Sequence, residues 1–213
     1  QPHFSDAKTN EISKTTSVLQ TLLDENKIVD LNDLAIGENK NVFWILYVDV
    51  SILNCDGVLL DICLLGVSAA LHATNLPCVT LVPEEMELDS VADAAQIFPD
   101  KISVSDTCRS LKCTEKSPLT SCSFLLLDSE KSANQEIIVS CDPIEFEINL
   151  FPNNILTLII GESKDNGKPQ IYGVYKYGGT CLANEETFDN CLNLAAKRKL
   201  ELNNLLDQAL THR

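Results

Sequence analysis

The sequence predicts a two-layer mixed α/β (α+β) fold, and three parts of the chain carry that prediction. Residues 42–53 are aromatic and β-branched, which is the composition of a strand. Residues 58–74 are apolar nearly all round, as in a buried helix. Four short strand patterns between residues 123 and 175 precede a long amphipathic stretch at 184–210. Helices packed on a sheet would bury these apolar surfaces.

The N-terminal third predicts a helix followed by a strand. Residues 1–10 are polar and are expected to form an extended arm, while apolar residues recur at helical spacing over residues 11–25. The 42–53 strand ends in a period-two alternation. Asp56-Gly57 follows it as a turn, because glycine accepts a positive φ.

The remaining elements follow from similar patterns. Residues 83–120 form an acidic insertion that we expect to be irregular, with weak strand candidates at 97–98 and 102–104. The predicted strands are 78–82, 123–127, 136–140, 155–160 and 170–175, with a hairpin turn at 165–167 between the last two. Asn184 is the predicted N-cap of the final helix.

Length and charge narrow the function classes. The 213 residues suit one domain spanning residues 1–213, and no apolar run reaches the length of a membrane helix. The formal charge of −15 argues against an autonomous nucleic-acid binder, whose affinity comes mostly from phosphate contacts. Lys197, Arg198 and Lys199 form the one basic cluster, so they are the candidate RNA contacts. The alternative is that they form an ordinary solvated face.

Nine cysteines occur without any C-x-x-C pair, which argues against a zinc site. Buried free thiols in a reducing compartment are the simpler interpretation, and they favour cytosol or nucleus over secretion. No metal or cofactor is predicted. The chain starts at Gln1 and its one methionine is Met86, so we expect a processed or incomplete copy of a longer protein.

Several motifs resemble the ribonuclease PH family, and within it most closely the non-catalytic ring subunits of the eukaryotic RNA exosome. The motifs are Trp44–Val50, Asp56-Gly57, Leu60-Asp61, Ala69–Leu71 with Leu76-Pro77, Cys141–Pro143 and Tyr175–Gly179. The resemblance implies a ribonuclease PH-like fold. One departure is large: the family's opening strands and its Arg-Pro-Asp-Gly-like segment have no counterpart in this sequence.

The resemblance also locates the family's catalytic positions. Active members cleave RNA with phosphate, using two aspartates six residues apart and a phosphate-binding arginine. The first aspartate corresponds to Asp142, but the second falls on Ile148, and no phosphate-binding arginine can be placed. Isoleucine can neither hold a metal ion nor move a proton, so the chain is predicted not to be an enzyme. Glu145 and Glu147 could substitute only with a shifted register.

The implied role is a structural subunit of a six-membered ring around an RNA channel. It would assemble with related ring subunits and RNA-binding cap proteins and support 3′-to-5′ RNA processing, including rRNA processing, and RNA degradation in nucleus, nucleolus and cytoplasm. Trp44, Leu64, Val67 and Leu71 are the candidate partner interface. Two alternatives stay open: a phosphorolytic exoribonuclease with a rearranged site, and a free-standing homodimeric interaction module.

A few polar residues have both a functional and a structural interpretation. Gly178–Thr180 precedes the last helix and could hold an anion, but a simple turn is favoured. Asp49 and Asp61 could be catalytic, but structural carboxylates or turn caps are favoured. His72 fits a core or interface position better than a general base.

Overall fold

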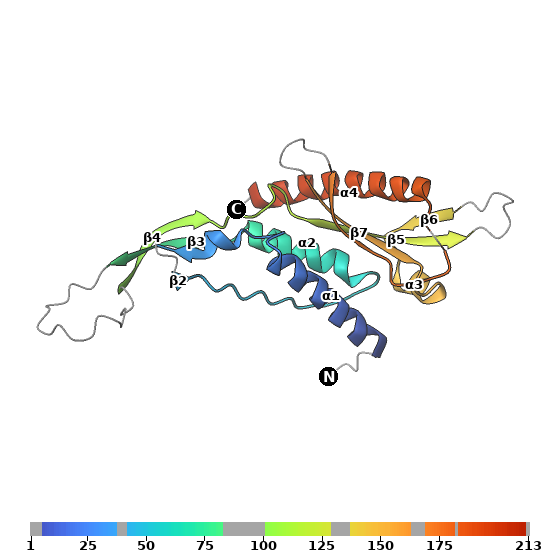
Figure 1. Cartoon of the computed structure of the whole chain (residues 1–213), viewed down its shortest axis with the longest axis horizontal. Helices are drawn as coiled ribbons and strands as arrows, with labels where there is room; N and C mark the ends of the chain where they lie inside the picture. The colour runs from blue at the N-terminus through green and yellow to red at the C-terminus, as the bar shows by residue number, and fades with distance from the viewer. Residues whose placement is uncertain are drawn as a thin grey trace, which may run out of the picture.

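The computed structural model has a four-stranded antiparallel sheet between helices (Figure 1). It describes residues 6–37, 42–82, 101–128, 137–162, 169–181 and 183–211. The elements in chain order are α1 (Asp6–Asp24), η1 (Leu31–Leu34), β1 (Ala35–Ile36), β2 (Val42–Phe43), α2 (Leu59–His72), β3 (Asn75–Val82), β4 (Lys101–Ser110), β5 (Thr120–Asp128), β6 (Ile137–Cys141), α3 (Glu145–Leu150), β7 (Ile155–Glu162), β8 (Pro169–Tyr175) and α4 (Glu185–Thr211).

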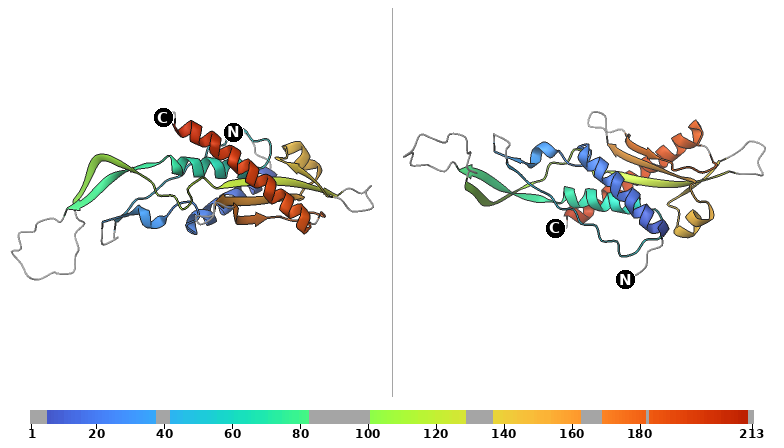
Figure 2. Two further views of the ribbon diagram at one scale, coloured as in Figure 1. Left: turned by 90° about the horizontal axis from the view of Figure 1, so that it is seen from above. Right: turned by 60° about the horizontal axis from the view of Figure 1, so that its bottom comes forward.

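The central sheet has the strand order β6-β5-β7-β8, with every neighbouring pair antiparallel. Side chains of successive residues point to opposite faces of a sheet, so Leu156, Leu158 and Ile160 of β7 lie on one face and Ile159 on the other. The mixed α+β class is therefore confirmed. Helices nevertheless cover both faces, so there are three layers where two were predicted (Figure 2).

Helix α2 forms the core on one face of the sheet, together with α1. Leu64, Val67 and Leu71 are at most 5% exposed and share a cluster with Val18 and Leu22 of α1. Burying one such side chain contributes about 1.5–3 kcal/mol. The prediction of Leu64, Val67 and Leu71 as partner contacts is wrong, because the chain's own α1 and sheet already take up these side chains.

Helix α4 covers the opposite face. Cys191 and Ala195 are fully buried in the cluster formed with β5 and β7. Asn184 is the N-cap, as predicted: its Oδ1 accepts a hydrogen bond of 2.7 Å from the N–H of Thr187. Among the described residues, none of the helices has the length and apolarity to cross a bilayer.

Parts of two regions that were expected to lack helices and strands form them, at residues 6–10 and 101–110. Residues 6–10 were expected to be extended but form the first turns of α1, where Lys8 pairs with Glu145 of α3 at 3.0 Å. The expected irregular insertion contains β4, which pairs with β3 in a two-stranded ribbon that protrudes from the body (Figure 1). The weak strand candidate at 102–104 lies within β4 and is confirmed, but the full length of the strand was not predicted, because its sequence is largely polar and its pairing with β3 stabilises it. The strand candidate at 97–98 lies outside the described residues.

The predicted strand at 42–53 is mostly wrong. Only Val42 and Phe43 pair, with Ile36 and Ala35. From Trp44 onward the chain runs as an extended thread towards the start of α2, without a partner strand among the described residues (Figure 1). Strand-forming composition alone does not make a strand, because the backbone groups also need a hydrogen-bonding neighbour.

Candidate functional site

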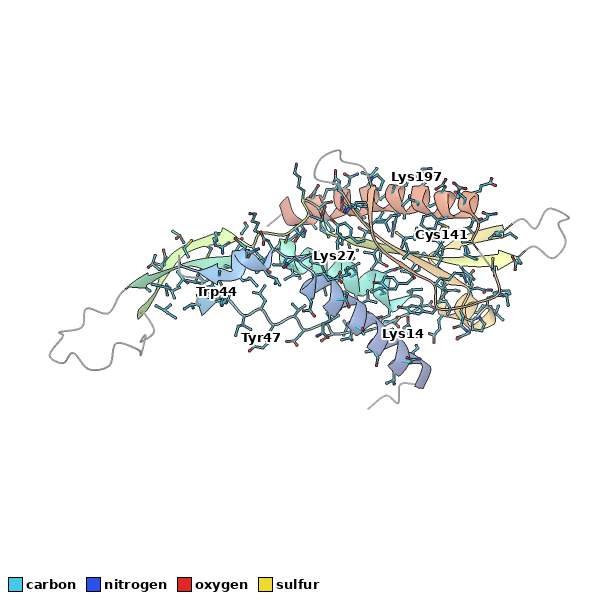
Figure 3. The ribbon with its side chains drawn as sticks, in the orientation of Figure 1. Lys14, Lys27, Trp44, Tyr47, Cys141 and Lys197 are labelled. Atoms are coloured by element: carbon cyan, nitrogen blue, oxygen red, sulfur yellow. The ribbon has the colours of Figure 1, made fainter. Side chains whose placement is uncertain are left out.

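A cleft of about 720 Å³ lies where α2, β5, β6 and α4 meet, and its lining includes Asp142, the residue that the resemblance matches to a catalytic aspartate. It forms because β6 pairs with β5 only from Phe124 onward, which leaves Thr120 to Ser123 at an open edge. Figure 3 labels Lys197 on α4 and Cys141 at the end of β6, two of the lining residues. The polar residues that line the cleft are Asn54, Asp56, Asp61, Ser121, Ser123, Asp142, Lys197, Arg198 and Glu201.

The innermost charged group of the cleft is Asp61, in the first turn of α2. The hydroxyls of Ser121 and Ser123 both donate to its Oδ1, the latter at 3.1 Å. Ser123 also shares a 2.8 Å hydrogen bond with Thr157 of β7. Burial raises the pKa of Asp61 to about 6, against the opposing effect of these hydrogen bonds. Asp61 is thus a hydrogen-bonded structural carboxylate, as the sequence favoured.

The serine pair was missed in the sequence. Ser121 and Ser123 alternate with Cys122 and Phe124, so the hydroxyls face α2 while the apolar side chains face α4. Two polar residues at period two in an otherwise apolar strand are the signal that could have identified them. Cys122 is buried behind them, and this burial raises the pKa of its thiol to about 12.

Asp142 lies at the rim of the cleft, directly after β6. Its backbone has a φ of 53°, and its N–H donates to the carbonyl of Ser123 at 3.1 Å. This left-handed residue turns the chain away from β5 and so ends the β5–β6 pairing. Asp142 is exposed, with its carboxylate at the mouth of the cleft.

Ile148 does not join Asp142. It lies in α3 and lines a separate cavity of about 450 Å³ beside α1. The start of α3 is fixed close to the turn before α2: Asp56 accepts a 3.0 Å hydrogen bond from the N–H of Glu145. At Gly57, where φ is 136°, an added Cβ would lie 2.9 Å from the carbonyl oxygen of Pro143. Asp142 and Ile148 therefore line different cavities.

Glu145 and Glu147 have structural partners. Glu145 pairs with Lys8, and Glu147 accepts a 3.1 Å hydrogen bond from the N–H of Ile144 at the start of α3. Neither of them lines the cleft that contains Asp142. A shifted register therefore brings no second acid to Asp142.

The basic cluster on α4 divides between two environments. Lys197 and Arg198 line the cleft, and Arg198 pairs with Glu201 at 3.1 Å. Lys199 is 5% exposed and donates to the carbonyl of Pro118 at 2.8 Å. Burial lowers the pKa of Lys199. The prediction of Lys199 as an RNA contact is wrong, because consecutive residues of a helix face different directions.

The charge of the cleft is unfavourable for a phosphate ligand. Four carboxylates line it, those of Asp56, Asp61, Asp142 and Glu201, against the two cations Lys197 and Arg198. Like charges repel strongly where water is partly excluded. In the described part of the chain, no group of three or more His, Cys, Asp or Glu side chains is placed to hold a metal ion.

The other candidates lie outside the lining of the cleft. Gly178 and Gly179 have φ values of 117° and 89°, and the N–H of Thr180 donates to the side chain of Asn154 at 3.0 Å, so a side chain of the same protein already accepts the hydrogen bond that an anion would take. His72 is half-buried at the end of α2, and burial lowers its pKa. Asp49 is exposed on the extended thread, away from the cleft lining. All nine cysteines are free thiols.

Comparison with known proteins gives partial matches, among them two archaeal proteins. No family model matches the chain. The exosome complex component Rrp42 of Methanopyrus kandleri is 29% identical over 107 residues, which is 49% of this chain and 39% of that protein. The exosome complex component Rrp42 of Sulfurisphaera tokodaii is 38% identical over 71 residues, 33% of this chain and 26% of that protein. The matches thus span about two-fifths and a quarter of these relatives. Over part of its length, the chain is a distant homologue of archaeal exosome complex components named Rrp42.

Proposed function

We propose that the chain is a non-catalytic structural subunit of an exosome ring. It supports 3′-to-5′ RNA processing and degradation by assembling with related ring subunits and with RNA-binding cap proteins. We further propose a eukaryotic setting, with the protein in nucleus, nucleolus and cytoplasm. The homology to archaeal exosome components and the mixed α+β fold support the assembly role.

The observation that carries the non-catalytic part is the composition of the cleft. Asp142 lies at its rim, while Ile148 lines a different cavity. A phosphorolytic site must bind inorganic phosphate beside the RNA backbone, and both are anions. With four carboxylates against two cations, one of which is paired with Glu201, the cleft lacks the positive charge for that task. The chain's formal charge of −15 points the same way, so the partners supply most of the RNA contacts.

The test combines partner identification with a decay assay. The tagged chain is isolated from its native extract, and its partners are identified by mass spectrometry. The purified chain is then incubated with single-stranded RNA with and without inorganic phosphate. We expect several ribonuclease PH-like subunits among the partners and no release of nucleoside diphosphates by the chain alone.

Asp142→Asn is the variant that separates residual catalysis from contamination. A non-catalytic subunit predicts the same background decay for the chain and for this variant. Phosphate-dependent decay that Asp142→Asn abolishes would contradict the proposal. An Asn149→Asp variant is the matched control, because Asn149 is exposed and lines the other cavity.

A further inference from the structure

Beside the cleft lies the cavity that Ile148 lines, of about 450 Å³, which we term the α1 cavity. Contacts between separate elements frame it. Lys8 of α1 pairs with Glu145 of α3 at 3.0 Å, and Glu11 of α1 accepts a 3.0 Å hydrogen bond from the N–H of Leu59 at the start of α2. Because α1, α2 and α3 hold one another through these bonds, the shape of the cavity is preorganised, as in most small-molecule sites.

Apolar side chains form much of the wall of the α1 cavity. Its buried and half-buried aliphatic side chains are those of Val18, Val58, Leu60, Ile148 and Ile155. Thr157 is a buried polar residue of the wall, but its hydroxyl already shares a 2.8 Å hydrogen bond with Ser123. Such a wall packs well against an aliphatic or aromatic body and offers few hydrogen bonds to a highly polar ligand such as a sugar.

Lys14 carries the one lining charge that no opposite charge or helix end offsets among the described residues. The charged lining residues are Lys8, Glu11, Lys14 and Glu145. Lys8 and Glu145 neutralise each other, and the carboxylate of Glu11 lies at the N-terminus of α2, the positive end of the helix dipole. The ammonium of Lys14, which Figure 3 labels on α1, instead stands over the ring of Tyr177, with 4.8 Å between Nζ and the ring centroid. In the described part of the chain, it pairs with no acid.

This distribution of charge favours a ligand with a single negative charge. A cationic ligand would be repelled by Lys14. A doubly charged phosphate monoester would find one unpaired cation and, close to it, the carboxylates of Glu11 and Glu145. A carboxylate brings one charge, and its oxygens accept charge-assisted hydrogen bonds from an ammonium.

We propose that the α1 cavity binds a small organic carboxylate. The aliphatic or aromatic body of the ligand packs against the apolar wall around Leu60 and Ile155, and its carboxylate pairs with the ammonium of Lys14. The inference goes beyond the proposed function, because neither ring assembly nor RNA processing requires such a ligand.

The test titrates the full chain with three probes of the same shape and follows its backbone amides by nuclear magnetic resonance. The probes are 4-phenylbutyrate, the neutral 4-phenylbutanamide and the cationic 4-phenylbutylamine. We expect saturable shifts of amides in α1 and α3 with the carboxylate and none with the amine. The amide should bind about three- to fivefold more weakly than the carboxylate, which is the contribution of one exposed ion pair.

Variants of the chain make the assignment specific. Lys14→Gln should make the carboxylate and the amide bind equally, while Lys14→Arg keeps the charge and should retain the preference. Lys197→Gln is the matched control, because Lys197 is an exposed lysine that lines the cleft and not the α1 cavity. Asn149→Trp places a large ring at an exposed lining position and should weaken the binding of both probes.

Three results would overturn the proposal. One is no saturable shift at millimolar 4-phenylbutyrate, and another is a preference for the carboxylate that Lys14→Gln leaves unaltered. The third is a set of shifts confined to residues that line the cleft, which would assign the binding to the other site. Failure in these assays leaves the ring assignment standing, since that assignment is tested by partner identification and RNA decay.

Discussion

Strand β5 and residues 45–53, which we term the open segment, have the same length and very different surroundings. Each has nine residues, most of them apolar. In β5 the backbone pairs on both sides over Phe124 and Leu125, and both side chains are at most 2% exposed. In residues 45–53 the backbone has no partner strand among the described residues, and Leu53 is 97% exposed. The difference shows that strand formation depends on two segments. The sequence of one segment determines its side chains, but a neighbouring strand must supply hydrogen-bond partners for its backbone N–H and C=O groups.

The test with the largest expected effect shortens one side chain to alanine in each region. Leu158→Ala in β7 should lower the free energy of unfolding by about 2–5 kcal/mol, because Leu158 is fully buried between β5, β8 and α4. Tyr47→Ala in the open segment should change it by less than about 0.5 kcal/mol. Urea denaturation monitored by circular dichroism measures both. A Tyr47→Ala effect as large as that of Leu158→Ala would show that the open segment is already packed in the isolated chain.

The second test concerns Asp61, the buried acid of α2 that accepts a hydrogen bond from Ser123 of β5. Because the pKa of Asp61 is raised to about 6, its contribution favours the folded state at low pH and is lost as pH rises from about 4 through about 6. Asp61→Asn should remove this loss. The free energy of unfolding of the variant, relative to that of the unsubstituted chain, should therefore be higher at pH 8 than at pH 4.5, by at most about 3 kcal/mol. Urea denaturation at the two pH values measures the change. Asp49→Asn, at an exposed site, serves as the control: it keeps Asp61 and should show the same change of stability with pH as the unsubstituted chain.

A third test loosens the helix that covers the paired sheet. Asn184→Ala removes the acceptor for the N–H of Thr187 and should destabilise the chain by about 1 kcal/mol. Asn190→Ala lies on an exposed position of the same helix and should alter stability by only a few tenths of a kcal/mol. Equal effects of the two substitutions in thermal unfolding would argue against a capping role for Asn184.

The smallest expected effect is on exchange rates without any substitution. Amides of Ser123 to Leu126 pair within the sheet and should be among the last to exchange with deuterium. Amides 45–53 should exchange near the rate of an unstructured peptide. Strong protection of residues 45–53 in the dilute, partner-free chain would remove the contrast.

Sequence predicted the paired half of the fold well. Strands β5 to β8 and helices α2 and α4 lie within a few residues of their expected positions, because each is a continuous or periodic apolar run of strand or helix length. Helix α3 was missed, since its six residues are stabilised by distant contacts from Lys8 and Asp56. The same limit explains the error at 42–53, where the deciding factor is a neighbour and not the segment itself.

The candidate site was predicted in part. The resemblance matched Asp142 to a catalytic aspartate, and the structure places this residue at a cleft that the sequence did not predict. The hydrogen bond from Ser123 to Asp61 fits the structural role that was favoured for Asp61. The serine donors to Asp61 come from a strand about sixty residues away, and no local pattern links them to it. Lys199 could not be separated from Lys197 and Arg198 by composition, because only the direction of each residue around α4 distinguishes them.

The buried ammonium of Lys199 makes this residue a reporter of folding. Amine-reactive reagents label side chains that solvent can reach, and Lys199 is held against the carbonyl of Pro118 with 5% of its surface exposed. Lys197, two residues earlier, is exposed. In a native sample the label should therefore appear on Lys197 and not on Lys199, and the ratio between the two should approach one as the chain unfolds. The ratio of the two labels, measured by mass spectrometry on a peptide that contains both lysines, then gives the folded fraction, and the label on Lys197 serves as the internal standard.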